Sequence, residues 1–364
     1  MKTALVHDWL NQRGGAEDVL ETLISIFTDA PVFTSLYYPD AMPETYRKWD
    51  IRTSFIDGLP WAKRHQQYYL PLYPRAFEQF DFSEYDLVIS NKSGFCHGIV
   101  TGAETVHICY CLTPTRYVWN YEQYAEREQI GWLPRLLLPP IVSRLKSWDR
   151  LAADRVDHFI AISDVVRRRI ADIYIRDSSI IYPPVDTNRF KPSSIVEDYY
   201  LIVGRLVPYR RIDLLIEAFN KLDRPLVIAG SGRDKDILEQ EAGPNITFLG
   251  YVPDQDLPDL LARCRAFIFP GEEDFGIAPV QAMASGRPVI AYSAGGALDT
   301  VTPESGVLFA EQTVADIIKA VESFDTSKVN PAEIRAHAEK FDISAFSEQL
   351  LGYIDRIMSN NLVN

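Results

Sequence analysis

The sequence predicts an α/β protein with two domains, each built around a doubly wound parallel sheet. Short apolar runs typical of strands alternate with amphipathic helical segments along both halves of the 364-residue chain. These strand–loop–helix units lack hairpin signals, which favours parallel pairing. Near the middle, Pro183 and Pro184 follow a strand-like run and would form a stiff connector. A chain of this length can bury two separate cores.

The connector sets the expected domain bounds. We expect an N-terminal domain over 1–185, a C-terminal domain over 186–343 and an amphipathic helix over 344–364. The boundary region itself is expected near 183–195, where the two prolines stiffen the backbone.

The overall charge limits the class of partner. The chain has 47% hydrophobic and 24% charged residues, as ordinary globular proteins do, and its formal net charge is −13 at pH 7. Because nucleic-acid phosphates require a basic face, this balance argues against a nucleic-acid partner.

The cysteines and the N-terminus bear on metal binding and compartment. Cys109 and Cys111 lie two apart in an apolar run and would share one face of a strand. This spacing does not fit a zinc site, so buried free thiols are expected for Cys96, Cys109, Cys111 and Cys264. The chain starts in a strand pattern without a signal peptide, and no apolar run reaches about 18 residues. We therefore expect a cytoplasmic location.

The first half begins with a candidate phosphate-binding loop. Strand-like runs are expected at 3–7, 31–35, 51–53, 86–90, 106–111, 159–163 and 179–182. The first run leads into a loop with adjacent Gly14 and Gly15, and a helix is expected over 16–27. Glycine lets the backbone approach a phosphate, and the helix amides point outward. The alternative is a plain strand-to-helix turn.

Two segments, 61–77 and 117–150, combine aromatic with basic side chains. Such segments suit contact with a membrane surface or with a lipid-carrier acceptor. The alternative is a helical lid whose aromatic side chains pack on the core.

Two further loops of the first half follow strands. His97 lies in the loop 91–98, where it either supplies a polar contact beside a cleft or is simply solvated. Arg116 ends the loop 112–116 and is a candidate for contact with an acceptor or a phosphate.

The second half opens with a strand-like run at 200–204 that leads into two cations. Arg205 and Arg210 precede a helix expected over 214–220. Cations at the carboxyl end of a strand, before a helix, form a trap for an anion, each charged hydrogen bond contributing about 1.5–3 kcal/mol. The alternative is ordinary surface arginines.

Two more strand-like runs, at 226–229 and 246–249, reach the same sheet edge. Gly232 closes a tight turn after the first, and Tyr251 and Val252 follow the second. Asp254 and Asp256 resemble a metal-binding D-x-D pair. Since they precede a helix expected over 257–262, we interpret them as its N-cap and expect no metal site.

The stretch 266–290 combines a strand, an acidic loop, a helix and a second strand. The loop carries Glu272, Glu273 and Asp274, and Gly286 ends the helix that starts at Ile277. Free amides near the helix start favour an anion, whereas carboxylates accept hydrogen bonds from sugar hydroxyls. The pattern therefore predicts a ligand with both phosphate and polyol parts. The alternative is that the carboxylates only complement the helix dipole, by about 0.3–1 kcal/mol each.

Several of these motifs, in the same order, resemble those of retaining family-4 (group 1) glycosyltransferases of the GT-B fold. Glu273 and Gln281 match an E-x7-E motif with glutamine in second place, and Arg205 and Arg210 match R-x4-K with arginine in second place. The resemblance also covers a GGAE-like loop at 14–17, a linker of the type PxxVDxxRF, and an HTP motif whose histidine is replaced by Leu112.

The resemblance implies a fold and a site. It implies two Rossmann-like domains facing a cleft, with the C-terminal helix crossing back to the first domain. Glu273 would hold the donor sugar, Arg205 and Arg210 would neutralise its diphosphate, and His97 is the remaining catalytic candidate. The residues expected to bind the nucleotide are Gly14, Gly15, Gly232, Tyr251, Val252, Phe275, Gly276, Ile277 and Gln281.

The resemblance also implies the activity. We expect a retaining glycosyltransferase that uses a nucleotide-diphosphate sugar, GDP-mannose by closest pattern, without metal or cofactor. The acceptor would be a glycan or a polyprenyl-diphosphate-linked sugar, met at the inner face of the cell membrane. Two alternatives stay open: a degenerate, non-catalytic partner subunit, suggested by Leu112, Gln281 and Arg210, and a sugar-nucleotide epimerase.

Overall fold

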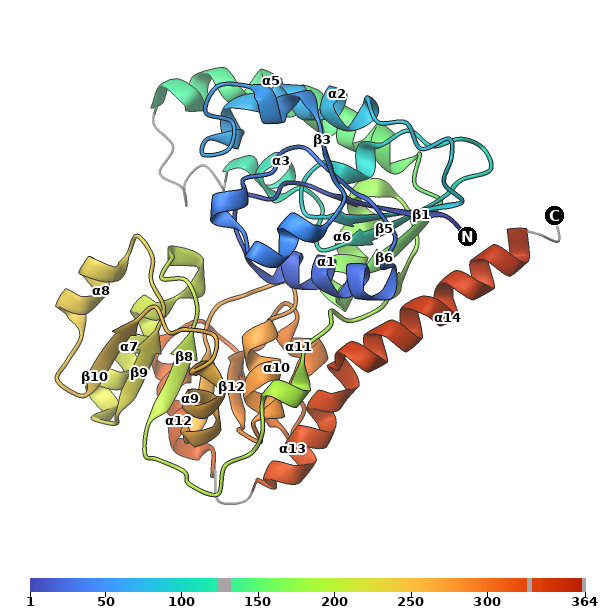
Figure 1. The fold of residues 1–364 in the computed structure, drawn as a ribbon. Coiled ribbons are helices and arrows are strands. Elements are labelled where there is room, and N and C mark those ends of the chain that lie inside the picture. The colour runs from blue at the N-terminus through green and yellow to red at the C-terminus, as the bar shows by residue number, and fades with distance from the viewer. Residues whose placement is uncertain (123–131, 326–328, 362–364) are drawn as a thin grey trace. The chain divides into compact units, whose positions relative to one another are not determined.

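The computed structural model describes residues 1–122, 132–325 and 329–361. The chain divides into two compact units, the first formed by Met1–Tyr182 with Gln349–Asn364 and the second by Pro183–Glu348. Each unit has its own parallel sheet and its own core (Figure 1).

The first unit contains a seven-stranded sheet in the order β3-β2-β1-β4-β5-β6-β7, and every pair described in it is parallel. The strands are β1 (Thr3–His7), β2 (Val32–Thr34), β3 (Ile51–Thr53), β4 (Leu87–Lys92), β5 (Val106–Cys111), β6 (His158–Ala161) and β7 (Ser178–Ile180). The α-helices are α1 (Gly15–Ile26), α2 (Tyr73–Glu78), α3 (Arg116–Trp119), α5 (Trp132–Ala153) and α6 (Asp164–Tyr174). Short 3-10 helices are η1 (Pro39–Ala41), η2 (Glu44–Lys48), η3 (Phe55–Gly58), η4 (Gln66–Leu72) and η5 (Cys96–Gly98).

The first core lies between the central strands and the helices that cover them. Val6 of β1 and Val88 of β4 are fully buried in one cluster with Phe77 of α2 and Phe95. Burial of aliphatic and aromatic side chains of this kind contributes about 1.5–3 kcal/mol each. The paired central strands β1 and β4 are thereby fixed in register, with His7 opposite Asn91.

The second unit contains a six-stranded sheet in the order β10-β9-β8-β11-β12-β13, and its described pairs are also parallel. The strands are β8 (Tyr200–Val203), β9 (Leu226–Ala229), β10 (Ile246–Gly250), β11 (Ala266–Phe269), β12 (Val289–Tyr292) and β13 (Gly306–Phe309). The helices are α7 (Ile212–Leu222), α8 (Lys235–Glu241), α9 (Leu257–Arg263), α10 (Ile277–Ala284), α11 (Ala297–Thr300), α12 (Val314–Ser323), α13 (Pro331–Ala338) and α14 (Ile343–Asn361), which passes from the second unit into the first. Short 3-10 helices are η6 (Thr187–Arg189), η7 (Pro208–Arg210) and η9 (Glu339–Phe341).

The second core explains why α7 and α12 are amphipathic. Leu215 and Phe219 of α7 lie four residues apart and are fully buried, and Ile317 and Val321 of α12 share the same cluster. Residues spaced by four lie on one helix face, so each helix buries one side against the sheet.

The predicted fold class is confirmed, and several expected strand bounds differ from the structure by one or two residues. The runs expected to end at residues 163 and 182 end as β6 at Ala161 and as β7 at Ile180. The run expected to end at residue 90 continues as β4 to Lys92. Asn91 and Lys92 are polar but buried, and they pair with Tyr110 and Cys111 of β5. The amide nitrogen of Asn91 donates to the carbonyl of Ala16, and Lys92 donates to Thr113 and Thr115. These hydrogen bonds offset part of the cost of burying the two residues.

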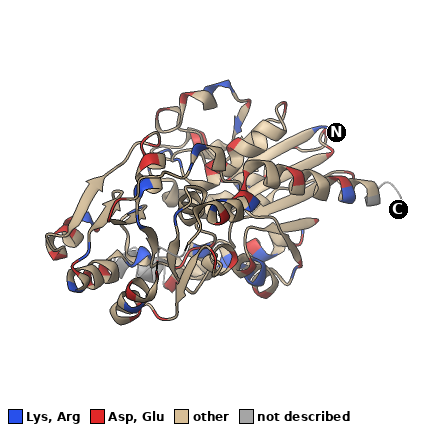
Figure 2. Ribbon diagram, turned by 90° about the horizontal axis from the view of Figure 1, so that it is seen from below, with Lys and Arg blue, Asp and Glu red and all other residues tan. Residues whose placement is uncertain are grey.

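The surface carries mixed charge. In the view of Figure 2, acidic and basic residues are interspersed over the helices of both units. Among the described residues, no helix is both long and apolar enough to cross a membrane.

Candidate functional site

The strand orders indicate where a ligand would bind in each unit. In open parallel sheets, ligands bind beyond the carboxyl ends of the strands at the point where the strand order reverses. That point lies between β8 and β11 in the second unit, and between β1 and β4 in the first. The predicted arginines follow β8, the acidic loop follows β11, and the loop with Gly14 follows β1.

Arg210 and Glu273 form an ion pair across the reversal point of the second sheet. The Nη2 atom of Arg210 lies 2.6 Å from Oε1 of Glu273, and the two side chains are 15% and 20% exposed. Gly204, at the end of β8, makes room for this arginine, because a Cβ there would lie 2.4 Å from Nη1 of Arg210. Arg210 and Glu273, both predicted to bind the ligand, therefore bind each other in this structure.

Arg205 lies on the same edge in a different environment. Its side chain is exposed, and its Nη2 donates a hydrogen bond to the hydroxyl of Tyr209 at 3.3 Å. An exposed guanidinium beside a half-buried one gives this edge two cations, as an anion site requires.

Helix α10 presents its N-terminus behind the acidic loop. Its N-cap is Gly276, with φ of 90°, and no side chain in the described chain caps it. Phe275 is buried with its ring 5.7 Å from that of Phe341, so its backbone alone can meet a ligand. Ile277 and Gln281 are one turn apart and both half-buried, so they share a face of the helix.

The loop with Gly295 and Gly296 holds the acidic loop 271–276 in place. The amide of Gly296 donates to the carbonyl of Glu273 at 2.9 Å. A Cβ on Gly296 would lie 2.2 Å from the Cα of Phe275, so the two loops pack backbone against backbone. The position of Glu273 therefore depends on glycine at 296.

The remaining predicted residues of the second unit follow β9 and β10. Gly232 lies against the backbone of Leu206, Tyr251 is largely exposed and Val252 is half-buried. The interpretation of Asp256 as the N-cap of α9 is confirmed for its position, but the capping hydrogen bond of its side chain is not formed within the described residues. The bond is missing because the backbone of Asp256 is already helical, with φ −95° and ψ −16°.

The loops of the first unit are organised by a buried carboxylate that the sequence analysis missed. Gly14 is the N-cap of α1, and no described side chain caps it. Asp8, just after β1, is buried and accepts hydrogen bonds from four successive backbone amides at 2.6–2.8 Å, those of Ser93, Gly94, Phe95 and Cys96. The signal that the sequence offered for this role was the position of Asp8, a polar residue directly after a buried strand.

The expectations for His97 are corrected by its burial. His97 is fully buried in η5, so it is neither solvated nor placed to touch a ligand. Its Nε2 lies 3.3 Å from the carbonyl oxygen of Asp149, and its ring packs near Trp148 and Tyr174. Burial, reinforced by the charge of Lys92, holds the pKa of His97 well below its usual value.

A charged cluster is buried behind the loop 112–116. Lys92 donates to the carbonyl of Thr113 and to the hydroxyl of Thr115, each at 3.2 Å. Asp149 accepts from Thr115, Trp119 and Tyr174 at 2.6–3.0 Å. Burial alone would lower the pKa of Lys92, but the charge of Asp149 raises it above its usual value. The cluster fixes the start of α3, where Arg116 lies.

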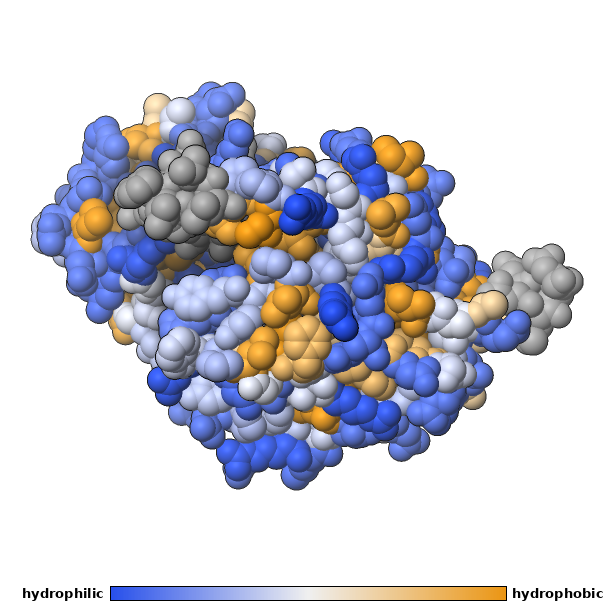
Figure 3. Space-filling view, turned by 90° about the horizontal axis from the view of Figure 1, so that it is seen from above, coloured by the Kyte–Doolittle hydropathy of each residue, from blue (hydrophilic) through white to orange (hydrophobic). Residues whose placement is uncertain are grey.

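The aromatic-basic segments divide between core and surface. In 61–77, Tyr73 and Phe77 are buried, as the lid alternative expects, whereas Trp61 and Tyr68 are 76% and 66% exposed. Figure 3 shows apolar side chains gathered at several places on the face seen from above. In the segment 117–150, residues 123–131 lie outside the described residues.

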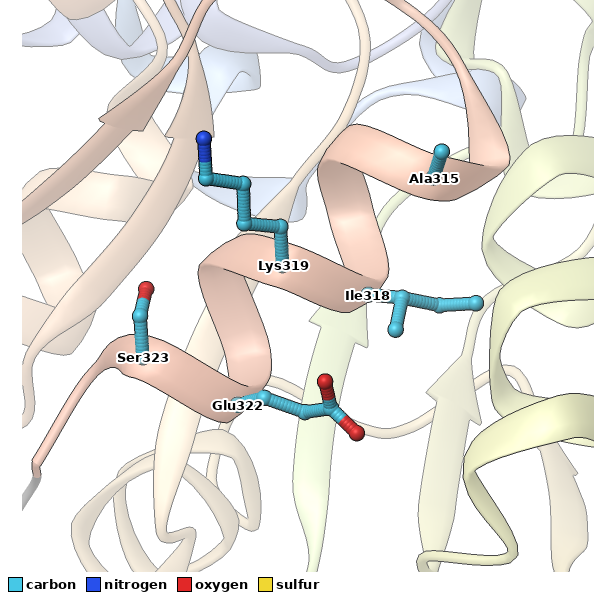
Figure 4. Close-up of a pocket in the computed structure, with 5 residues that line it drawn as sticks. All are labelled: Ala315, Ile318, Lys319, Glu322 and Ser323. Atoms are coloured by element: carbon cyan, nitrogen blue, oxygen red, sulfur yellow. The ribbon is translucent and has the colours of Figure 1, made fainter.

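A pocket along α12 contains none of the residues predicted for the site, and the described residues offer no metal site. This pocket is lined by Ala315, Ile318, Lys319, Glu322 and Ser323, all from one helix (Figure 4). In the described parts of the chain, no group of three or more His, Cys, Asp or Glu side chains could hold a metal ion.

Comparison with known proteins assigns both halves to glycosyltransferases. Residues 186–341 match the family model described as glycosyl transferases group 1, and residues 13–189 match that of glycosyltransferase family 4. A Corynebacterium glutamicum GDP-mannose-dependent monoacylated alpha-(1-6)-phosphatidylinositol monomannoside mannosyltransferase is 37% identical, over 50% of this chain and 54% of that protein. The Escherichia coli O-antigen chain mannosyltransferase B is 31% identical, over 40% of this chain and 42% of that protein. The matched regions thus span about half the length of these relatives.

Solved structures show the same fold along nearly the whole chain. Anabaena HepE, in complex with UDP, has a TM-score of 0.73 at 19% identity, covering 98% of this chain and 100% of that one. Sucrose-phosphate synthase from Thermosynechococcus elongatus has a TM-score of 0.76 at 17% identity, covering 99% and 100%. The fold is therefore that of GT-B glycosyltransferases. With both halves matched by the family models, the chain belongs to glycosyltransferase family 4, among the group 1 glycosyltransferases.

Proposed function

We propose that this protein is a retaining glycosyltransferase that moves a sugar from a nucleotide-diphosphate donor to a glycan or lipid-linked acceptor. The observation that carries the proposal is the meeting of Arg210 and Glu273 at the reversal point of the second sheet, beside Arg205 and the open N-terminus of α10. Cations and helix amides suit a diphosphate, and a carboxylate suits sugar hydroxyls.

In this proposal the protein acts mainly by stabilising the leaving group. As the bond between the anomeric carbon and the phosphate oxygen breaks, negative charge grows on the diphosphate. Arg205, Arg210 and the amides of Phe275, Gly276 and Ile277 would meet that charge. Hydrogen-bond donors that are already aimed at the developing charge account for the larger part of the rate enhancement in many enzymes. The two arginines would take the place of a divalent ion.

The stereochemistry follows from the side chains available. Glu273 would hold the sugar hydroxyls rather than attack the anomeric carbon, since its carboxylate is paired with Arg210. The acceptor hydroxyl would then attack on the face from which the diphosphate leaves, and its proton would pass to the departing phosphate oxygen. Configuration is retained by this route.

The donor is proposed to be GDP-mannose. Two matched relatives are named mannosyltransferases, and the name of the Corynebacterium protein specifies GDP-mannose. The rival is a UDP-sugar, because the HepE structures contain UDP and UDP-glucose. Tyr251 and Val252 follow β10 at the sheet edge and would contact the base through their backbone, and Gln281 would hold the ribose.

We propose further that the acceptor is met at the inner face of the cell membrane, from the cytoplasm. The exposed rings of Trp61 and Tyr68, close in sequence to Lys63 and Arg64, suit a lipid interface. Co-sedimentation with vesicles containing anionic lipid tests this. Binding should weaken when Trp61 and Tyr68 are replaced by serine, and unchanged binding would contradict it.

A thermal-shift screen tests the donor-binding function. GDP-, UDP-, dTDP- and ADP-sugars are compared without metal, for the wild type and for Glu273→Ala and Arg205→Ala. At a hundredfold excess over Kd, a ligand stabilises the folded protein by about 2.7 kcal/mol. One nucleotide should raise the midpoint, and Arg205→Ala should lose the shift. No shift with any donor would contradict the proposal and favour a non-catalytic partner. Product analysis separates the other alternative, because an epimerised donor among the products would indicate an epimerase.

A further inference from the structure

The first unit contains a pocket between helices α3 and α5. Its volume is about 490 Å³, which lies within the range of about 300–1,000 Å³ typical of small-molecule sites. None of the residues that line it was predicted to bind the donor. We call it the Trp119 pocket. Its aromatic and polar lining residues are Trp119, Asn120, Tyr121, Glu122, Ser143 and Lys146, and aliphatic side chains of α5 complete it.

A buried carboxylate fixes the indole ring of the Trp119 pocket. Nε1 of Trp119 donates a hydrogen bond to Oδ2 of Asp149 at 2.6 Å, and Asp149 is fully buried. Nζ of Lys146 lies 5.7 Å from the centre of the indole ring. A charge-assisted hydrogen bond at the edge of the ring and a cation at its face both restrict its orientation. The pocket therefore has an aromatic side chain whose position does not depend on a ligand.

Tyr121 brings a hydroxyl group to the same pocket. Its hydroxyl oxygen is buried, and within residues 1–122, 132–325 and 329–361 no group forms a hydrogen bond with it. A buried hydroxyl without a hydrogen bond costs free energy. A polar ligand in the pocket would remove this cost by supplying the missing bond. Packing within the protein alone gives no reason for tyrosine instead of phenylalanine at this position.

The chemistry of the lining suits a neutral sugar. Carboxylates only accept hydrogen bonds and ammonium groups only donate them, so Glu122 and Lys146 offer both kinds of partner, and the hydroxyl of Ser143 can do either. Sugar hydroxyls need both kinds, whereas a phosphate would meet the negative charge of Glu122. The indole and phenol rings offer apolar faces to the C–H face of a sugar ring.

We propose that the Trp119 pocket binds one sugar unit of a glycan. The identification of this glycan as the acceptor rests on the proposed function, whereas the binding of a sugar does not. In a transferase, binding energy from a part of the acceptor that does not react can serve specificity. The pocket thus assigns acceptor selection to named side chains of α3, α5 and the two residues 121 and 122.

Two pairs of variants test the Trp119 pocket. Tyr121→Phe removes the unbonded hydroxyl and keeps the ring. Its control, Tyr46→Phe, removes another hydroxyl of the same unit, one that donates to Oε1 of Glu21 at 2.9 Å. Ser143→Trp fills the pocket from an exposed position of α5, and its control, Ser147→Trp, adds the same side chain one turn further along, outside the lining. Binding of mannobiose, cellobiose, chitobiose and inorganic phosphate is measured by saturation-transfer NMR titration, without any donor.

The expected results separate ligand binding from folding. The wild type should bind at least one of the three disaccharides. Tyr121→Phe should raise its Kd by about 3- to 10-fold, as the loss of one hydrogen bond does, without lowering the midpoint of thermal unfolding. Tyr46→Phe should do the reverse, lowering the midpoint and leaving Kd unchanged. Ser143→Trp should abolish binding, and Ser147→Trp should retain it.

The sugar site and the transferase function fail by different results. The sugar site would be overturned if the wild type bound none of the disaccharides, if it bound phosphate in their place, or if Tyr121→Phe and Ser143→Trp both kept the wild-type Kd. None of these results depends on a donor. A wild type that binds a disaccharide, but neither binds GDP or UDP nor releases either from a donor, would overturn the transferase function and leave the sugar site standing.

Discussion

The guanidinium of Arg210 lies 2.6 Å from the carboxylate of Glu273, so the loops on either side of the strand-order reversal are joined by an ion pair. Arginine has five N–H donors and can bind a carboxylate and a phosphate at once. A lysine would offer a single point charge instead. The pair therefore explains how arginine can serve at this position, where the family resemblance has lysine.

Loss of the carboxylate should separate nucleotide binding from turnover. Glu273→Gln removes the negative charge that pairs with Arg210 and weakens its hold on that cation, so Kd for GDP or UDP should stay equal or fall. Release of sugar from the donor should drop by about 100-fold or more, because the sugar loses its carboxylate ligand. Calorimetry and product analysis measure the two quantities. A loss of nucleotide affinity as large as that in Arg210→Ala would show that Glu273 mainly supports the fold.

Removing the buried carboxylate of Asp149 should strongly destabilise the first unit. Asp149→Ala leaves Lys92 buried without its counter-charge, which costs about 3–5 kcal/mol. The control is Asp50→Ala, which breaks an exposed pair with Arg52 at 2.8 Å and should cost about 0.2–1 kcal/mol. Urea unfolding measures the loss of unfolding free energy in both variants. Losses of similar size would contradict a charged interaction between the buried Lys92 and Asp149.

Acid should destabilise the protein through His107. Burial lowers the pKa of His107 from 6.5 to about 3 in the folded protein. The unfolded chain therefore takes up a proton as the pH falls below 6.5, while the folded protein stays unprotonated until about pH 3. The stabilisation is complete above pH 6.5 and declines by about 1.4 kcal/mol per pH unit between these values. His107→Gln should flatten the pH dependence of the unfolding free energy between pH 6 and 4, and an unchanged slope would contradict this assignment.

The contact between two glycine loops should make Gly296 intolerant of a side chain. Gly296→Ala would place a Cβ 2.2 Å from the Cα of Phe275, so the loop with Glu273 must move. We expect a loss of about 1–3 kcal/mol, as in overpacked cores, together with reduced sugar release. The control is Gly352→Ala in α14, where a Cβ meets nothing within 4 Å and a helical alanine should stabilise by about 0.5–1 kcal/mol. Equal effects in thermal unfolding would contradict the close packing.

Much of the fold could be predicted because local patterns of apolar, glycine and proline residues indicate the strands and the loops. The runs at β5 and β9 have the expected bounds, and the glycines and prolines mark the loops that follow strands. Placement of Arg205, Arg210 and Glu273 near one sheet edge also follows from sequence, since the carboxyl ends of parallel strands share an edge.

The rest depended on contacts that periodicity does not encode. The ion pair of Arg210 with Glu273 depends on the order of the strands, which brings β8 next to β11. The burial of His97 results from packing of η5 against α5, and a single turn of 3-10 helix carries no period that could reveal it. Asp8 and Asp149 were missed because their partners are backbone amides and distant side chains.

Release of nucleoside diphosphate in the absence of metal shows whether the two arginines replace a divalent ion in the proposed transferase. The wild type, Arg205→Ala and Arg210→Ala are incubated with GDP-mannose or UDP-glucose and EDTA, and free nucleoside diphosphate is quantified by chromatography. The wild type should release GDP or UDP, and each variant should release it at least about tenfold more slowly. The two arginines would not have this role if the wild type released no nucleotide from either donor, or released it only when a divalent ion was added.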